Sequence, residues 1–150
     1  MTTLAVRTIA ALRAEHTGLA TTVAGLSPAQ LKGPSGASEW TVAQVLSHLG
    51  SGAEITLAGF RAGLGETPAP APDFNQSVWD RWNARAPEEQ AAGSVESNAT
   101  LVAAFEALTP EQHAEIAINP GFLPQPLPLA GFAGMRLSEV AHHTLSLIHI

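Results

Sequence analysis

Apolar residues recur at helical spacing along most of this 150-residue chain. Between residues 42 and 53 they stand at i, i+3, i+4, i+7 and i+11, which is typical of the buried face of a helix. The same periodicity predicts helices over residues 3–24, from 87 to 108 and from about Pro128 onward. No segment shows a strand pattern, so the sequence predicts an all-α bundle of four helices.

Cap and turn residues set the boundaries of these helices. Thr41 and Gln44 form a T-x-x-Q capping box, which predicts a sharp start for the second helix. A third helical region begins near Asn75, and Pro87 interrupts it and starts a fresh helix. Residues 119–128 are rich in proline, so we expect them to form an extended crossover before the last helix.

Composition and charge favour one globular domain. The net charge of −6 and the absence of a basic run argue against a nucleic-acid partner. The N-terminus lacks a secretory pattern, and four prolines between Ile116 and Met135 argue against a membrane helix there. Because the chain has no cysteine, it has no disulfide framework, and a reactive thiol would have to come from outside. We expect a cytoplasmic protein.

Three side chains form a candidate metal site. Glu139 and His143 are i, i+4 neighbours on the apolar side of the last helix, about 40° apart around its axis. We therefore expect both to face the bundle interior. His48 falls at the edge of the buried stripe of the second helix. A divalent metal shared by the three would satisfy the buried groups and leave a coordination position open, as catalytic zinc does.

Spacing alone leaves other interpretations open. Arg136 stands three residues before Glu139, so a local ion pair could satisfy the carboxylate in a plain helical domain without metal. His142 offers an E-x-x-H spacing that competes with the spacing of His143.

The remaining histidines and the tryptophans show no ligand pattern. We expect the other histidines at the surface and the tryptophans in the core; they are His16, His113 and His149, and Trp40, Trp79 and Trp82. No G-x-S-x-G, Walker loop, dinucleotide fingerprint or H-E-x-x-H motif is present, so the sequence marks no other catalytic chemistry.

Two segments resemble the signatures of a known family. Residues 38–49, SEWTVAQVLSHL, resemble the W-T-V-x-x-V-x-x-H-L signature of the mycothiol-dependent maleylpyruvate isomerase family. Residues 136–143, RLSEVAHH, resemble that family's R-L-x-E-x-x-x-H helix. The resemblance covers nearly the whole chain. It implies the family's N-terminal, DinB-like metal-binding domain, a four-helix bundle with a proline-rich crossover before its last helix.

Carried over position by position, the resemblance implies that His48, Glu139 and His143 are the metal ligands, and it selects His143 over His142. It implies a divalent metal, zinc in the first place, and mycothiol, a low-molecular-weight actinobacterial thiol, as cofactors. The partners would be this thiol and an electrophilic small molecule. Metal coordination lowers the pKa of a thiol, and the thiolate would add to a conjugated double bond, allow rotation and leave.

The chain departs from the family at its C-terminal end. The family's second motif continues with Trp-Asp, whereas Thr144 is followed here by LSLIHI, and the family's C-terminal domain lies outside this sequence. The codons CTG TCT CTT ATA CAC ATC would encode residues 145–150 and resemble a transposase end used in sequencing libraries. We therefore interpret residues 145–150 as non-native, and residues 1–144 as a metal-binding bundle truncated in its last helix.

The sequence thus predicts the metal-binding domain of a mycothiol-dependent isomerase or thiol transferase. The rival from another class is a non-catalytic metal-binding module with a regulatory or interaction role, which would bind metal without reacting with a thiol. No motif marks the catalytic residues, the thiol-binding residues, the substrate or the oligomeric state.

Overall fold

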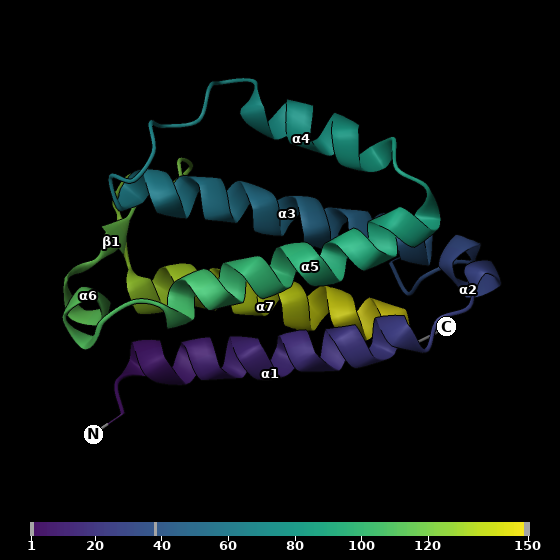
Figure 1. Ribbon diagram of the computed structural model, residues 1–150, viewed down its shortest axis with the longest axis horizontal. Coiled ribbons are helices and arrows are strands. Elements are labelled where there is room, and N and C mark those ends of the chain that lie inside the picture. The colour runs from purple at the N-terminus through teal and green to yellow at the C-terminus, as the bar shows by residue number, and fades with distance from the viewer. Residues whose placement is uncertain (1, 38, 149–150) are drawn as a thin grey trace.

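The computed structural model describes residues 2–37 and 39–148 of the chain. Within them, four long helices form a bundle, namely α1 (Leu4–Ala24), α3 (Val42–Gly63), α5 (Pro87–Glu106) and α7 (Leu129–Ile148) (Figure 1). Helices α1 and α7 run in one direction and α3 and α5 in the other (Figure 1). The predicted all-α four-helix bundle is confirmed. Across these described residues, no helix is both long enough and apolar enough to cross a membrane.

The core is built from the apolar stripes of the four long helices. The predicted stripe of α3 is buried from Val42 to Ala53. Toward the other end of α3, Phe60 meets Phe105 of α5 and Phe132 of α7, with ring centroids 4.9 and 6.3 Å away. Burying side chains of this size contributes about 1.5–3 kcal/mol each. Apolar packing therefore makes a large contribution to holding the four helices together.

Helix α4 (Phe74–Asn83) returns the chain from the end of α3 to the start of α5 and lies on the outer side of α3 (Figure 1). Its Trp82 is buried against Gly50 of α3 and Gly93 of α5. A Cβ atom at Gly50 would collide with the indole ring, so only glycine permits this close approach. The predicted interruption at Pro87 is confirmed, because α4 and α5 are separate helices.

The shorter elements are α2 (Pro28–Lys32), α6 (Pro110–Glu115), β1 (Ala117–Ile118) and β2 (Leu127–Pro128). The prediction that the chain has no strand was wrong at β1 and β2, which pair antiparallel with Ile118 opposite Leu127. The two ends of the proline-rich crossover meet in this pair, and Ile118 is buried. A two-residue ladder is too short to produce a recognisable alternation in the sequence.

Burial differs from the prediction at two tryptophans and one histidine. Trp40 and Trp79 are exposed, because they lie in the loop before α3 and on α4, outside the four-helix core. His16 is buried. It lies on the inner stripe of α1 between Leu12 and Leu19, at a spacing that the sequence already displayed.

The end of α7 bears on the interpretation of the C-terminal residues. Residues 145–148 continue the helix, and Leu147 is buried in the core. The non-native origin of residues 145–150 stays a prediction. His149, expected at the surface and without function, lies outside the described residues, whereas His113 on α6 is half-buried.

Candidate metal centre

The cap at the start of α3 fixes the direction of His48. The Oγ1 atom of Thr41 accepts from the backbone N–H of Gln44 at 3.2 Å, and the Gln44 side chain accepts from the backbone N–H of Thr41 at 2.8 Å. This capping box sets the first turn of the helix. Six residues on from Val42, the side chain of His48 is 37% exposed, at the edge of the buried stripe as predicted.

Helix α7 directs Glu139 and His143 toward His48. The Nε2 atom of His48 lies 3.3 Å from Glu139 Oε2, and the Nε2 atom of His143 lies 3.4 Å from the same oxygen. One ligand atom from each of the three residues lies within 4.8 Å of the other two. The fold therefore brings together three residues that the sequence spreads over two distant segments.

The nitrogen–oxygen distances at Glu139 are compatible with a shared metal, and the His48 contact also meets the limits of a long hydrogen bond. A tetrahedral zinc with ligand bonds of 2.0–2.1 Å holds neighbouring ligand atoms about 3.3–3.4 Å apart. A charge-assisted hydrogen bond between nitrogen and carboxylate is shorter, at about 2.7–2.9 Å. The nitrogen–oxygen distances of 3.3 and 3.4 Å at Glu139 match the first value. Two imidazoles and a carboxylate are also a donor set that suits zinc and other divalent transition metals.

The expectation that Glu139 and His143 face the interior was wrong for Glu139. The side chain of Glu139 is 52% exposed, whereas that of His143 is 17% exposed. Val140 and Arg136 are buried on α7, so the inner stripe of the helix is centred on them. Glu139 stands at the rim of that stripe, where its carboxylate can reach the imidazoles and remain open to solvent.

Arg136 and Glu139 do not form the ion pair that was the alternative to a metal site. The guanidinium of Arg136 donates through Nη2 to the carbonyl oxygen of Leu49 at 2.6 Å and to Asn98 Oδ1 at 2.7 Å. The carboxylate of Glu139 is left facing the imidazoles of His48 and His143.

Burial favours the neutral, ligand-competent form of His143. Desolvation lowers the pKa of this imidazole, the nearby His48 lowers it further, and Glu139 opposes both. A neutral histidine binds metal through one nitrogen and keeps its proton on the other. Nε2 of His143 faces Glu139, while Nδ1 is buried and has no hydrogen-bond partner among the described residues.

An aromatic side chain that the sequence assigned to the core borders the site. The ring of Trp40 lies 5.3 Å from that of His48 and 6.4 Å from that of His143, stacked on the latter with an interplanar angle of 16°. The position of Trp40 directly before the capping box of α3 was the signal in the sequence that could have placed it beside the site.

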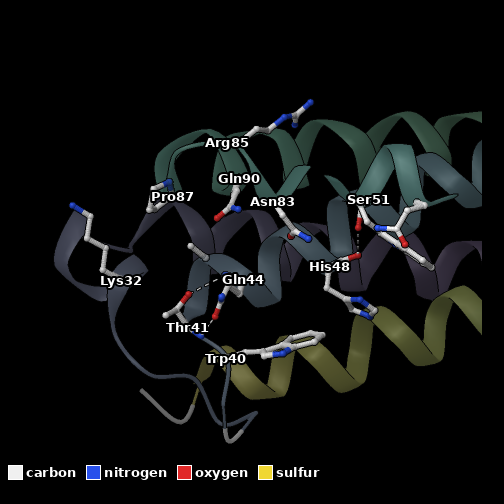
Figure 2. Close-up of a pocket in the computed structure, with 13 residues that line it drawn as sticks. Lys32, Trp40, Thr41, Gln44, His48, Ser51, Asn83, Arg85, Pro87 and Gln90 are labelled. Atoms are coloured by element: carbon white, nitrogen blue, oxygen red, sulfur yellow. Dashed lines mark hydrogen bonds between the residues drawn. The ribbon is translucent and has the colours of Figure 1, made fainter. Parts of the chain in front are cut away.

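Two hollows open beside the candidate ligands. The larger, of about 760 Å³, adjoins His48, and Figure 2 shows Lys32 and Pro87 toward one end and His48 and Ser51 toward the other. Its lining within the described residues contains amides and two cationic side chains but no carboxylate. The smaller, of about 210 Å³, is lined by Glu139 together with apolar side chains and with polar ones such as Asn119 and Arg136. Small molecules could therefore approach the site from two sides.

The fold and the side chains define a class of protein, a helical bundle with a candidate mononuclear metal centre of two imidazoles and one carboxylate. The family model described as "Mycothiol maleylpyruvate isomerase N-terminal domain" matches residues 12–148. The chain belongs to this family.

Solved structures share the fold. A crystal structure of a mycothiol-dependent maleylpyruvate isomerase superposes with a TM-score of 0.76 at 16% identity, over 98% of this chain and 63% of the other. A histidine-to-alanine variant of such an isomerase gives a TM-score of 0.74 at 19% identity, with the same coverage. The chain thus spans less than two thirds of the length of these relatives. No curated protein sequence matches it.

Proposed function

We propose that this chain is the divalent-metal-binding domain of a mycothiol-dependent isomerase or thiol transferase. His48, Glu139 and His143 would hold the metal, with zinc as the expected ion. The observation that carries the proposal is the convergence of three ligand atoms within 4.8 Å, from helices α3 and α7, in a member of this family. A cytoplasmic location fits such a role, because cytosolic thiols are kept reduced.

Each ligand contributes a separate property to the proposed centre. His143 is the most buried of the three, and its lowered pKa keeps it neutral. Glu139 supplies the negative charge that offsets part of the charge of a divalent ion. His48 borders the larger hollow, so a thiol entering there would reach the centre on that side. When bound, the metal would lower the pKa of the thiol and so supply a thiolate near neutral pH.

The larger hollow suits a polar thiol. Its wall carries the amide side chains of Gln44, Gln76 and Asn83, which can donate to and accept from hydroxyl groups. Trp79 adds an aromatic surface on α4. The smaller hollow lies on the Glu139 side and combines apolar side chains with the polar Asn119 and Arg136, and its volume suits an electrophilic partner of smaller size. The two components of the proposed reaction would therefore approach the centre from different sides.

Metal content and thiol binding test the proposal together. We expect near-stoichiometric zinc, by mass spectrometry, in protein purified without an affinity tag, and loss of the metal in His48→Ala and Glu139→Ala. Glu54→Ala is the matched control, since Glu54 is a carboxylate of α3 outside the cluster. Mycothiol should bind the metal-loaded protein in calorimetry and bind the chelated protein much more weakly.

Three outcomes separate the proposal from its rivals. Metal binding without any interaction with mycothiol would favour a non-catalytic metal-binding module. Metal that persists in both ligand variants would refute the three-residue site. An absence of metal after reconstitution, in this chain and in one with the last helix extended, would leave a plain helical domain.

A further inference from the structure

Arg136 carries a buried positive charge whose hydrogen bonds go to neutral acceptors. The residue is 5% exposed, and its Nη2 atom bridges the carbonyl oxygen of Leu49 and the Oδ1 atom of Asn98. Burial lowers the pKa of the guanidinium to about 10, so it is still protonated at neutral pH. Burying a charge against neutral partners opposes folding, so general stability does not explain this arrangement.

The position of Arg136 relates it to both helices of the proposed metal centre. Leu49, whose carbonyl accepts from it, directly follows His48 on α3. Arg136 itself precedes Glu139 by three residues on α7. The hydrogen bond therefore joins the two ligand-bearing helices within one turn of each ligand.

A glycine makes room for this contact. Gly52 lies one turn after His48 on α3, and a Cβ atom there would stand 2.9 Å from the Nη1 atom of Arg136. Any larger residue at position 52 would therefore displace the guanidinium or push α7 away from α3.

Helix α5 holds the acceptors in place. The amide of Asn98 donates to the carbonyl of Leu49 at 3.3 Å and to the carbonyl of Ser94 at 2.8 Å, which orients its Oδ1 atom toward Arg136. Ser97 of α5 also donates to the carbonyl of Gly50 at 2.9 Å. Three helices therefore meet at the carbonyl groups of Leu49 and Gly50, the two residues that follow His48.

The most extensive packing in the bundle does not join α3 to α7. Their position along each other is therefore left to smaller contacts, such as that of Arg136 with Leu49. Helix α3 packs most extensively against α5, and α7 packs most extensively against α1. We propose that Arg136 is a positioning residue, which sets the register between α3 and α7 and with it the spacing of His48 and Glu139. This inference rests on the proposed metal centre, whose ligands must be held to within a few tenths of an ångström.

The test measures helix register and metal affinity separately. The variants are Arg136→Met, which removes the charge and the donors at similar length, Arg136→Lys, and Gly52→Ala, which leaves Arg136 in place. Because the chain has no cysteine, Arg61→Cys on α3 and Ser138→Cys on α7 can carry a pair of spin labels at exposed positions. Double electron–electron resonance then gives the distribution of distances between the two labels in chelated protein. A titration with Co²⁺ gives the affinity of the protein for the metal and the visible spectrum of the bound ion.

We expect Arg136→Met and Gly52→Ala to shift or broaden the distance distribution, to alter the Co²⁺ spectrum and to weaken Co²⁺ binding about tenfold or more. Arg136→Lys should be intermediate. The control Phe105→Leu, which destabilises the aromatic cluster between α3, α5 and α7 but leaves the Arg136 contacts intact, should change neither quantity.

Other results would overturn the inference. Unchanged distances and affinity in folded Arg136→Met and Gly52→Ala would remove the positioning role. Weaker binding at unchanged distances would mean that the charge of Arg136 acts alone, and changed distances at unchanged affinity would break the link to the metal. If the parent protein binds no metal, the proposed centre fails, while the distance distributions still decide whether Arg136 sets the register.

Discussion

Glu54 and Glu139 are carboxylates of the same bundle with opposite surroundings. Glu54 on α3 accepts hydrogen bonds from the guanidinium of Arg81 and, at 2.7 Å, from the indole N–H of Trp82. Glu139 on α7 faces two imidazole nitrogens at 3.3 and 3.4 Å. An arginine and a tryptophan are permanent donors, which occupy the carboxylate, whereas neutral imidazoles offer lone pairs as well. The comparison therefore distinguishes a structural carboxylate from one available as a ligand.

The affinity for metal should show the difference between Glu54 and Glu139 most clearly when each carboxylate is neutralised in turn. We expect Glu139→Gln to weaken zinc binding by more than about 100-fold, since it removes a direct ligand where even outer-shell changes cost 10–100-fold. Glu54→Gln should leave the affinity within about threefold. Competition with a chromophoric chelator measures both. Equal losses in the two variants would contradict the comparison.

In metal-free protein, where the free energy of unfolding is compared, Glu54→Gln should have the larger effect and Glu139→Gln the smaller one. Glu54→Gln should lower the free energy of unfolding by about 1–2 kcal/mol, because the buried Trp82 loses its charged acceptor, with the Arg81 pair discounted for its solvent exposure. Glu139→Gln should change it by less than about 0.5 kcal/mol, as expected for an exposed side chain. Urea unfolding in the presence of a chelator measures this. A larger loss in Glu139→Gln would mean that this carboxylate is structural.

The pH dependence of stability should show two windows. Burial lowers the pKa of His143 below its usual 6.5, so the unfolded chain takes up protons first and stability falls as the pH drops below about 6.5. Burial raises the pKa of Glu54, but hydrogen bonds from Arg81 and Trp82 outweigh it and lower the pKa overall. Its contribution is therefore present above about pH 4.5 and is lost below that value.

Unfolding of chelated protein between pH 3 and pH 8 checks these windows. His143→Gln should reduce the upper one and Glu54→Gln the lower one, to which Glu106 also contributes because the hydrogen bond from Arg13 lowers its pKa. His16, whose pKa burial also lowers, contributes to the upper window, so His16→Gln is a matched variant. An upper window that survives the loss of both histidines would contradict the assignment.

The smallest effect on metal binding should come from the tryptophans near the two carboxylates rather than from the carboxylates themselves. Trp40 lies beside the imidazoles that face Glu139, whereas the indole that bonds Glu54 is that of Trp82. We expect Co²⁺ to quench tryptophan fluorescence less in Trp40→Ala than in the control Trp79→Ala. The loss of its aromatic contacts should weaken metal binding by only about three- to tenfold. Equal quenching in both variants would place the metal elsewhere.

Helix periodicity and caps made most of the fold predictable. The stripe of α3, its capping box at Thr41 and the break at Pro87 all appear in the structure as predicted, because they depend on residues close together in the sequence. The β1–β2 pair was missed because it depends on two short segments that meet only after the crossover has folded back. The surface position predicted for His16 was wrong, because histidine occurs both in cores and at surfaces and its place on the α1 stripe decided the outcome here.

The candidate site was predictable in its membership but not in its surroundings. Spacing suggested His48, Glu139 and His143, and the resemblance to the family selected His143 over His142. The exposure of Glu139 depends on the rotation of α7, which its own sequence does not determine. The bonds of Arg136 to Leu49 and Asn98 depend on how three helices meet, so the sequence pointed to the nearer glutamate instead.

The contact of Trp82 with two glycines restricts how this protein can change during evolution. The indole fills a notch that Gly50 and Gly93 leave open between α3 and α5. A larger residue at Gly50 becomes acceptable only after Trp82 has been replaced by a smaller one, and the reverse order passes through an overpacked intermediate. Relatives that keep the tryptophan should therefore keep Gly50, whereas at Gly93 a Cβ atom would meet the Arg85 side chain first and the indole only at 3.1 Å. The attachment of α4, and with it one wall of the larger hollow, therefore depends on Trp82 and Gly50 changing together.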